Sequence, residues 1–376
     1  MIYFDNGATT LKKPSSVYKK IMYVMKKAGG NPGRGGHLMA DKASDEIFKT
    51  RVAVSEFFGI PNPQCVCFTN NATTALNYAI KGCLNEGDHV IISHYEHNSV
   101  YRPVHKLSSK GISYTVAESV DVEALDSLIR ENTKMIIVNH VSNVCGNTAD
   151  IKKIGAFAKE KGIIFMVDAS QSAGHIRIDV TDYNIDILAT AGHKSLFGMQ
   201  GSGILYIKEG IELDTTIEGG TGSMSLYRLQ PDIMPDRFEA GTPSTPAIAS
   251  LGAGIEFINS VGIENISNHI ANMNEFLVNG LELIDGIVVY GDKTSSVKSG
   301  VTGFNIEGAD SEIVASLLNE EYKIMVRGGL HCSCLAHEAM QTTETGCVRV
   351  SLSWFNTLKE CEKFLDTVDR IRLRVV

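Results

Sequence analysis

The sequence predicts an α/β protein with a mostly parallel sheet flanked by helices. Two observations support this class. Between residues 65 and 208, short apolar runs alternate with amphipathic, helix-like stretches, which is the pattern of strand–helix–strand units. The apolar runs are also nearly continuous, as expected for strands buried on both faces. The runs predict seven strands at 65–69, 89–93, 113–117, 135–139, 163–168, 185–190 and 203–208.

Helices are expected between and before these strands. The intervening stretches predict helices at 72–83, 99–110, 122–131 and 151–161, and two more precede the sheet at 14–27 and 40–58. The glycine-rich segment 29–37 between the first two helices cannot be helix interior. It contains Arg34 and His37, so both a ligand-facing loop and a plain connector stay open.

A second, smaller unit is expected at the C-terminal end. The regular pattern lapses over 210–245, where Gly and Pro indicate a long irregular segment that is functional or at an interface. Helices then resume, interspersed with short strands. The chain is therefore expected to divide into a large domain over 14–250 and an α+β domain over 251–376, with residues 1–13 packing nearby. The expected helices of the second unit are 246–259, 263–283, 310–320 and 358–372, and its strands are 287–290, 303–307, 324–326 and 347–351.

Composition excludes several classes of protein. The chain has 376 residues and a net charge of −8, which argues against a nucleic-acid-binding protein. No apolar run reaches the roughly 18 residues that span a bilayer, and the start of the chain does not resemble an export signal. Eight irregularly spaced cysteines do not suggest a disulfide framework. We therefore expect a cytoplasmic protein with no membrane or nucleic-acid partner.

Polar residues follow three of the predicted strands, where open α/β sheets bind ligands. Ala72 and Thr73 open a helix, whose free N–H groups and hydroxyl form a phosphate site or an ordinary cap. His97 could stack on a planar heterocycle or be structural. Asn143 offers a donor and an acceptor, or simply forms a turn before Gly146.

Two further strand ends carry charge. Asp168 ends a very apolar strand, so its carboxylate needs a partner such as a protonated ring nitrogen, or else it caps a turn. Gln171 is within reach of the same point. Lys194 follows the next strand, where a dry site would favour the neutral amine that forms a Schiff base. Together these groups match what pyridoxal 5′-phosphate (PLP) requires.

Four motifs carry a resemblance to a known family. Val167–Ser172, Ala191–Ser195 and Phe238–Pro243 resemble the class V aminotransferase group of fold-type I PLP enzymes. Arg327–Cys332 resembles the active-site cysteine region of group II (SUF-type) cysteine desulfurases and related selenocysteine lyases. The resemblance runs from Tyr3 to Arg349 and implies a fold-type I PLP-dependent transferase.

The resemblance also implies roles for individual residues. Lys194 would carry the cofactor as a Schiff base, Cys332 would take the sulfur, and His97 would stack on the ring. Asp168 would hold the ring nitrogen and Gln171 the ring hydroxyl. The phosphate would be bound by Ala72, Thr73 and His193, and by Thr242 of the partner subunit in a homodimer with shared sites; the substrate carboxylate would be bound by Asn143 and Arg349.

The implied activity is conversion of L-cysteine to L-alanine, with sulfur passed to Cys332 as a persulfide and then to an acceptor protein. Arg327 and His331 would favour the Cys332 thiolate. The motif departs from the SUF type at Leu330, where a second His is usual, and the role of the extra Cys334 stays open.

Three other functions are considered beside desulfuration. Selenocysteine lyase and class V aminotransferase use the same cofactor. A non-catalytic sulfur or metal carrier would use the Cys332 region with His337, or Cys65 and Cys67, whose spacing does not favour a zinc site. No resident metal is therefore expected.

Overall fold

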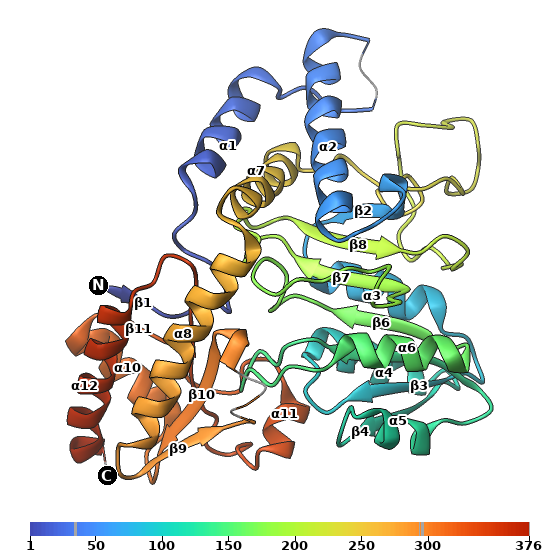
Figure 1. The fold of residues 1–376 in the computed structure, drawn as a ribbon. Coiled ribbons are helices and arrows are strands. Elements are labelled where there is room, and N and C mark those ends of the chain that lie inside the picture. Colours follow the sequence, from blue (N-terminus) through green and yellow to red (C-terminus); the bar gives the residue numbers. More distant parts are fainter. Residues whose placement is uncertain (34–35, 293, 295–296, 376) are drawn as a thin grey trace.

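A seven-stranded sheet forms the centre of the molecule (Figure 1). The computed structural model describes residues 1–33, 36–292, 294 and 297–375. The strand order is β2-β8-β7-β6-β5-β3-β4, and every neighbouring pair is parallel except the two that β8 makes. The predicted α/β class with a mostly parallel sheet is therefore confirmed. The strands are β2 (Val66–Thr69), β3 (His89–Ser93), β4 (Ser113–Ala117), β5 (Thr133–Asn139), β6 (Ile164–Asp168), β7 (Ile187–Ala191) and β8 (Gly203–Ile207).

Both faces of this sheet are buried, which explains the continuous apolar runs. In β3, Val90 and Ile92 pack on one face, whereas Ile91 packs on the other. The helices α3 (Ala72–Cys83) and α4 (Asn98–Ser108) cover the first face. The second face is covered by α5 (Val122–Leu128) and α6 (Ile151–Lys161).

Some details differ from the sequence-based expectation. β8 does not extend the sheet at an edge but lies between β2 and β7, antiparallel to both. As a result β2 runs in the same direction as β7, and their carboxyl ends meet at one edge. α5 ends at Leu128 rather than at residue 131, because Ile129 turns to extended backbone (ψ 137°) toward β5. Arg34 and Gly35 of the glycine-rich segment lie outside the described residues.

Two N-terminal helices pack on a helix that follows the sheet. α1 (Ser15–Lys27), α2 (Leu38–Phe57) and α7 (Thr245–Val261) lie together in Figure 1. The segment between β8 and α7 forms neither helix nor strand, as predicted. Within the described chain, no single helix is long and apolar enough to cross a membrane; α7 and α8 (Ile263–Glu282), bent by 82°, pass that test only as a pair.

The C-terminal region contains a separate three-stranded antiparallel sheet. Its order is β12 (Val348–Ser351), β10 (Val301–Ile306) and β9 (Ile287–Tyr290), with α10 (Ser311–Tyr322) and α12 (Leu358–Val375) beside it. The predicted strand near 324, β11 (Ile324–Met325), instead pairs in parallel with β1 (Ile2–Tyr3). The start of the chain is thereby attached to the C-terminal region. The sequence did not predict β1 or the short α11 (Cys334–Ala339), and the division at residue 250 stays a prediction.

Candidate active site

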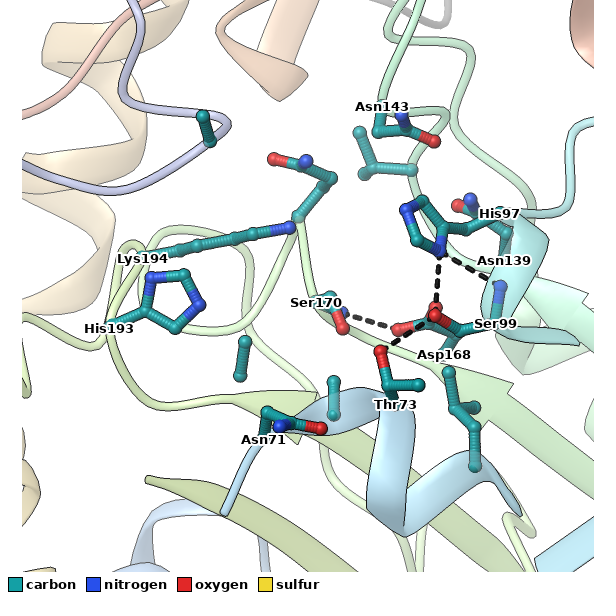
Figure 2. Close-up of a pocket in the computed structure, with 16 residues that line it drawn as sticks. Asn71, Thr73, His97, Ser99, Asn139, Asn143, Asp168, Ser170, His193 and Lys194 are labelled. Atoms are coloured by element: carbon teal, nitrogen blue, oxygen red, sulfur yellow. Dashed lines mark hydrogen bonds between the residues drawn. The ribbon is translucent and has the colours of Figure 1, made fainter. Parts of the chain in front are cut away.

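A cavity opens at the carboxyl ends of five strands of the large sheet, and eight of the predicted site residues line it (Figure 2). The eight are Ala72, Thr73, His97, Asn143, Asp168, Gln171, His193 and Lys194. The strand-end rule selected seven of these residues and the family resemblance added His193; the fold brings all eight together. Cys332, Arg349 and Thr242 do not line this cavity.

Strand register places the acidic group at the base of the cavity. Asp168 is the last residue of β6 and lies between Asn139 of β5 and Ala189 of β7. It is buried, and its Oδ1 accepts a hydrogen bond from the Ser170 backbone N–H at 2.9 Å. A buried carboxylate with one neutral donor favours a cationic or proton-bearing partner in the cavity.

Lys194 follows β7, and its side chain extends across the cavity (Figure 2). Its Nζ makes no hydrogen bond or ion pair with any described residue. Burial lowers the pKa of Lys194 to about 8, although the Asp168 charge opposes the shift. A substantial fraction of this amine is therefore neutral near pH 8 and can act as a nucleophile or base.

His97 is held in a fixed orientation at the start of α4. Its Nδ1 accepts the Ser99 backbone N–H at 3.0 Å and lies 2.9 Å from Ser99 Oγ. Ser99 Oγ in turn lies 2.8 Å from Thr73 Oγ1 (Figure 2). Burial lowers the pKa of His97, so the ring is neutral. A neutral imidazole held in place by this chain of contacts is suited to stacking on a planar ligand.

The first turn of α3 provides an anion site beside the same chain of contacts. Asn71 caps the helix by accepting the Thr74 N–H at 2.9 Å. The backbone of Ala72 and Thr73 begins the helix at the cavity wall, where free N–H groups and the helix dipole favour a phosphate. His193 also lines the cavity; its Nδ1 lies 3.0 Å from Thr9 Oγ1, and burial lowers its pKa to about 4.

Asn143 connects the cavity to two predicted residues outside it. Its Nδ2 donates to the His331 carbonyl at 2.9 Å, and its Oδ1 accepts from Ser333 Oγ at 2.8 Å, so it holds both neighbours of Cys332. Its own carbonyl accepts from Arg349 Nη1 at 2.9 Å. Arg349 is buried and also pairs with Asp5 at 2.9 Å, while its Nε makes no hydrogen bond in the described part of the chain.

Cys332 is exposed on a tightly turned loop, and both of its neighbours in the sequence are buried. The backbone is left-handed at both His331 (φ 48°) and Cys332 (φ 58°), and the Cys332 carbonyl accepts the Asn98 N–H at 2.8 Å. The loop is therefore attached to the start of α4, next to His97. Cys332 is also close enough for its charge to raise the pKa of Lys194.

His331 was expected to favour the Cys332 thiolate, and the structure shows that it cannot do so as a cation. Its Nε2 donates to the Cys347 carbonyl at 2.9 Å, and burial lowers its pKa to about 3. It is neutral at physiological pH. Arg327 remains a cation near this loop, paired with Asp5 at 2.7 Å.

Two other predicted groups lie apart from the cavity. Thr242 lines a separate, more open cavity beside Arg51 and Glu239, which form an ion pair at 2.8 Å. Cys65 and Cys67 are buried in the core of the large sheet, as ordinary core residues would be.

Half of the sixteen lining residues were not among the predicted site residues; two of these, and two residues nearby, bear on the chemistry of the site. Asn139 and Ser170 line the cavity, and their Oδ1 and Oγ are buried without a hydrogen-bond partner among the described residues. Both follow the strand-end rule and could have been found by it. Glu96, with a pKa raised to about 8 by burial, accepts the Asn139 backbone N–H at 2.7 Å. Asp5 had no local signal, because its partner Arg349 is 344 residues away.

Comparison with known proteins gives a consistent result. The family described as aminotransferase class-V matches residues 2–364. A probable cysteine desulfurase of Pyrococcus abyssi is 34% identical, with 99% of this chain and 94% of the relative covered. One from Methanothermobacter thermautotrophicus is 32% identical, covering 98% and 94%. The solved apo structure of a cysteine desulfurase from Thermococcus onnurineus has a TM-score of 0.91 at 32% identity, covering 99% of this chain and 95% of the other.

Proposed function

Because the chain belongs to the class-V aminotransferase family, we propose that it is a PLP-dependent cysteine desulfurase that converts L-cysteine to L-alanine. One observation carries the choice of this activity. An exposed thiol, Cys332, lies on a loop whose two flanking residues are held by Asn143, a residue of the cavity that contains Lys194. An aminotransferase would have no use for a thiol in that position.

The cavity fits the cofactor in charge and in unsatisfied hydrogen-bonding groups. Ser170 Oγ and Asn139 Oδ1 are buried orphans on its wall, and Lys194 Nζ has no partner in the described chain. Lys194 would attach PLP covalently, Asp168 would hold the ring nitrogen, Gln171 the ring hydroxyl, and His97 would stack on the ring. The phosphate would lie against Ala72, Thr73 and His193. When bound, PLP supplies an electron sink for carbanion chemistry.

The remaining chemistry belongs to residues of the chain. The neutral Lys194 amine removes the proton from Cα of the substrate. The substrate carboxylate is bound by Asn143 and by Arg349, whose buried Nε is an unused donor. Asp168 would pair with the ring nitrogen of the cofactor, because a buried carboxylate needs a cationic or proton-bearing partner.

Cys332 accepts the sulfur. Its thiolate attacks Sγ of the substrate, so that an S–S bond forms as the Cβ–Sγ bond breaks, and the released electron pair stays on the carbon framework, which is protonated to alanine. Arg327 provides positive charge near the loop. Two external thiol groups then reduce the persulfide: sulfide is released, the Cys332 thiol is regenerated, and the two thiols are oxidised to a disulfide. The exposure of Cys332 also permits transfer to an acceptor protein.

The direct test is product analysis with L-cysteine and a thiol reductant. We expect alanine and sulfide in equal amounts. Cys332→Ser should abolish sulfide release and leave bound cofactor unchanged, whereas the matched variant Cys334→Ser should retain activity. Unchanged turnover of cysteine in Cys332→Ser would exclude the persulfide step.

The same preparation addresses the remaining alternatives. If selenocysteine alone is turned over, the protein is a selenocysteine lyase. If an amino acceptor is required and no sulfide appears, it is an aminotransferase. All eight cysteines are free thiols, which supports the proposal that the protein works in a reducing compartment such as the cytoplasm.

A further inference from the structure

Two imidazoles and a thiol gather behind the Cys332 loop, outside the cavity described above. They are His331 of the loop, His337 of α11 and Cys347, which directly precedes β12. One ligand atom from each lies within 4.8 Å of the others. All three side chains are at least nine-tenths buried, with relative exposures of 9%, 0% and 0%. No step of the proposed desulfurase reaction uses this cluster.

The two imidazoles each leave one nitrogen unpartnered. His331 Nε2 donates to the Cys347 carbonyl at 2.9 Å, and since a carbonyl only accepts, Nδ1 carries the free lone pair. His337 Nδ1 pairs with Thr342 Oγ1 at 2.7 Å. His331 Nδ1 and His337 Nε2 are buried and make no hydrogen bond with any residue that the structure describes. Such orphans are costly in a protein interior and need an explanation.

The hydrogen bond that the other ring nitrogen of His331 makes is typical of a metal-binding histidine. A metal-binding histidine commonly fixes its ring by donating its other N–H to a carbonyl or another oxygen, as His331 does with Cys347. Burial lowers the pKa of both imidazoles, so they are in the neutral form that binds metals. Burial also raises the pKa of Cys347 to about 12, so its proton would be displaced by the ion.

We propose that His331 Nδ1, His337 Nε2 and Cys347 Sγ bind one thiophilic transition-metal ion of the zinc class. A set of two nitrogens and one sulfur suits zinc and does not suit Mg²⁺ or Ca²⁺, which take oxygen ligands. Zinc bonds of roughly 2.0–2.3 Å place tetrahedral ligands about 3.3–3.6 Å apart. The three ligand atoms now lie within 4.8 Å of one another, so small movements of the side chains would bring them to this separation.

An ion at this site would affect the loop that carries Cys332. His331 directly precedes Cys332, and its carbonyl is the acceptor for Asn143. A metal bond to His331 would hold the loop and thereby limit the mobility of the sulfur acceptor. This inference goes beyond the proposed function and does not depend on it.

The experiment measures metal uptake by the full-length holoenzyme. The protein, stripped with a chelator and without an affinity tag, is titrated with Co²⁺ and then Zn²⁺. We expect one Co²⁺ per chain, a thiolate-to-cobalt absorption band, and displacement by Zn²⁺. Cys347→Ser should lose the band, and His337→Gln should reduce uptake at least tenfold. The matched control Cys361→Ser, an equally buried thiol at 0% exposure, should bind as wild type does.

Three results would overturn the inference: no uptake by the wild-type protein, unchanged uptake in both Cys347→Ser and His337→Gln, or a band lost in Cys332→Ser but kept in Cys347→Ser. The last would place the metal on the exposed loop thiols. If circular dichroism shows that Cys347→Ser does not fold, His337→Gln decides the test. Because uptake is read without any turnover, failure here is distinguishable from failure of the desulfurase proposal.

Discussion

Lys194 is the residue on which the proposed chemistry depends. We expect Lys194→Ala to abolish the visible absorption of bound PLP and to lower desulfurase activity by at least about 10²-fold, the usual contribution of a general base. Absorption spectra and sulfide assays measure both effects. The control is Lys208→Ala, which removes a lysine on the same sheet that pairs with Asp186 far from the cavity. A visible band that persists in Lys194→Ala would contradict the assignment.

The environment of Lys194 also predicts a pH dependence. The pKa of Lys194 is lowered to about 8, so the fraction of the amine in the neutral form increases as the pH rises through 8. The rate at which cofactor-free protein takes up PLP covalently should therefore increase between pH 7 and 9, with a midpoint near 8. Stopped-flow absorbance measures it.

A variant of Asp168 tests the electrostatic cause of this midpoint. The Asp168 charge raises the pKa of Lys194, so Asp168→Asn should move the midpoint to lower pH. A midpoint that moves upward, or a rate that is flat from pH 7 to 9 in the wild type, would show that another group controls uptake.

At the scale of elements, the pairing of β1 with β11 brings the acidic residue that follows β1 next to two arginines of the C-terminal region. Asp5 follows β1 and pairs with Arg349 of β12 and Arg327, at 2.9 and 2.7 Å. Arg349 is buried, so removing its partner leaves an uncompensated charge. We expect Asp5→Ala to lower the free energy of unfolding by about 3 kcal/mol, measured by urea denaturation.

An exposed ion pair provides the control for this variant. Asp182→Ala breaks the pair with Lys152, in which both side chains are 58% exposed. The unfolding free energy should change much less there, because water already screens the two charges. Equal losses in the two variants would mean that Asp5 does not neutralise Arg349 in the native state.

How much the sequence could predict depends on whether a signal is local. The seven strands of the large sheet and the cavity residues Asp168 and Lys194 were predictable. A buried strand and the polar residue at its end can be recognised within a few consecutive residues. The partners of Asp5, the position of β8 inside the sheet and the grouping of Cys347 with two histidines join distant segments. Periodicity and turn residues do not encode such pairings.

At the scale of the whole molecule, an apolar surface on α1 is left uncovered by the residues that the structure describes. Tyr18, Met22 and Met25 are spaced by four and three residues, so they share one helix face, and each is at least half exposed (51%, 50% and 64%). Exposed apolar stripes of this kind mark interaction surfaces. In the predicted homodimer, we expect a second copy of the chain to cover this face. Thr242, which the resemblance assigns to a partner's phosphate, lies outside its own cavity.

This arrangement predicts that assembly and cofactor binding are linked. Light scattering should give a mass twice the 40.8 kDa of one chain. Met22→Asp should reduce the mass toward that of a monomer, since it buries a charge at the interface. Met22→Asp should also weaken the affinity for PLP. We expect Thr242→Ala to weaken this affinity as well but to leave the mass unchanged, because both variants remove the same contact to the phosphate. Leu283→Asp, at an exposed residue of the C-terminal region, should change neither quantity. A monomeric Met22→Asp protein with unaltered PLP affinity would mean that each chain completes its own site.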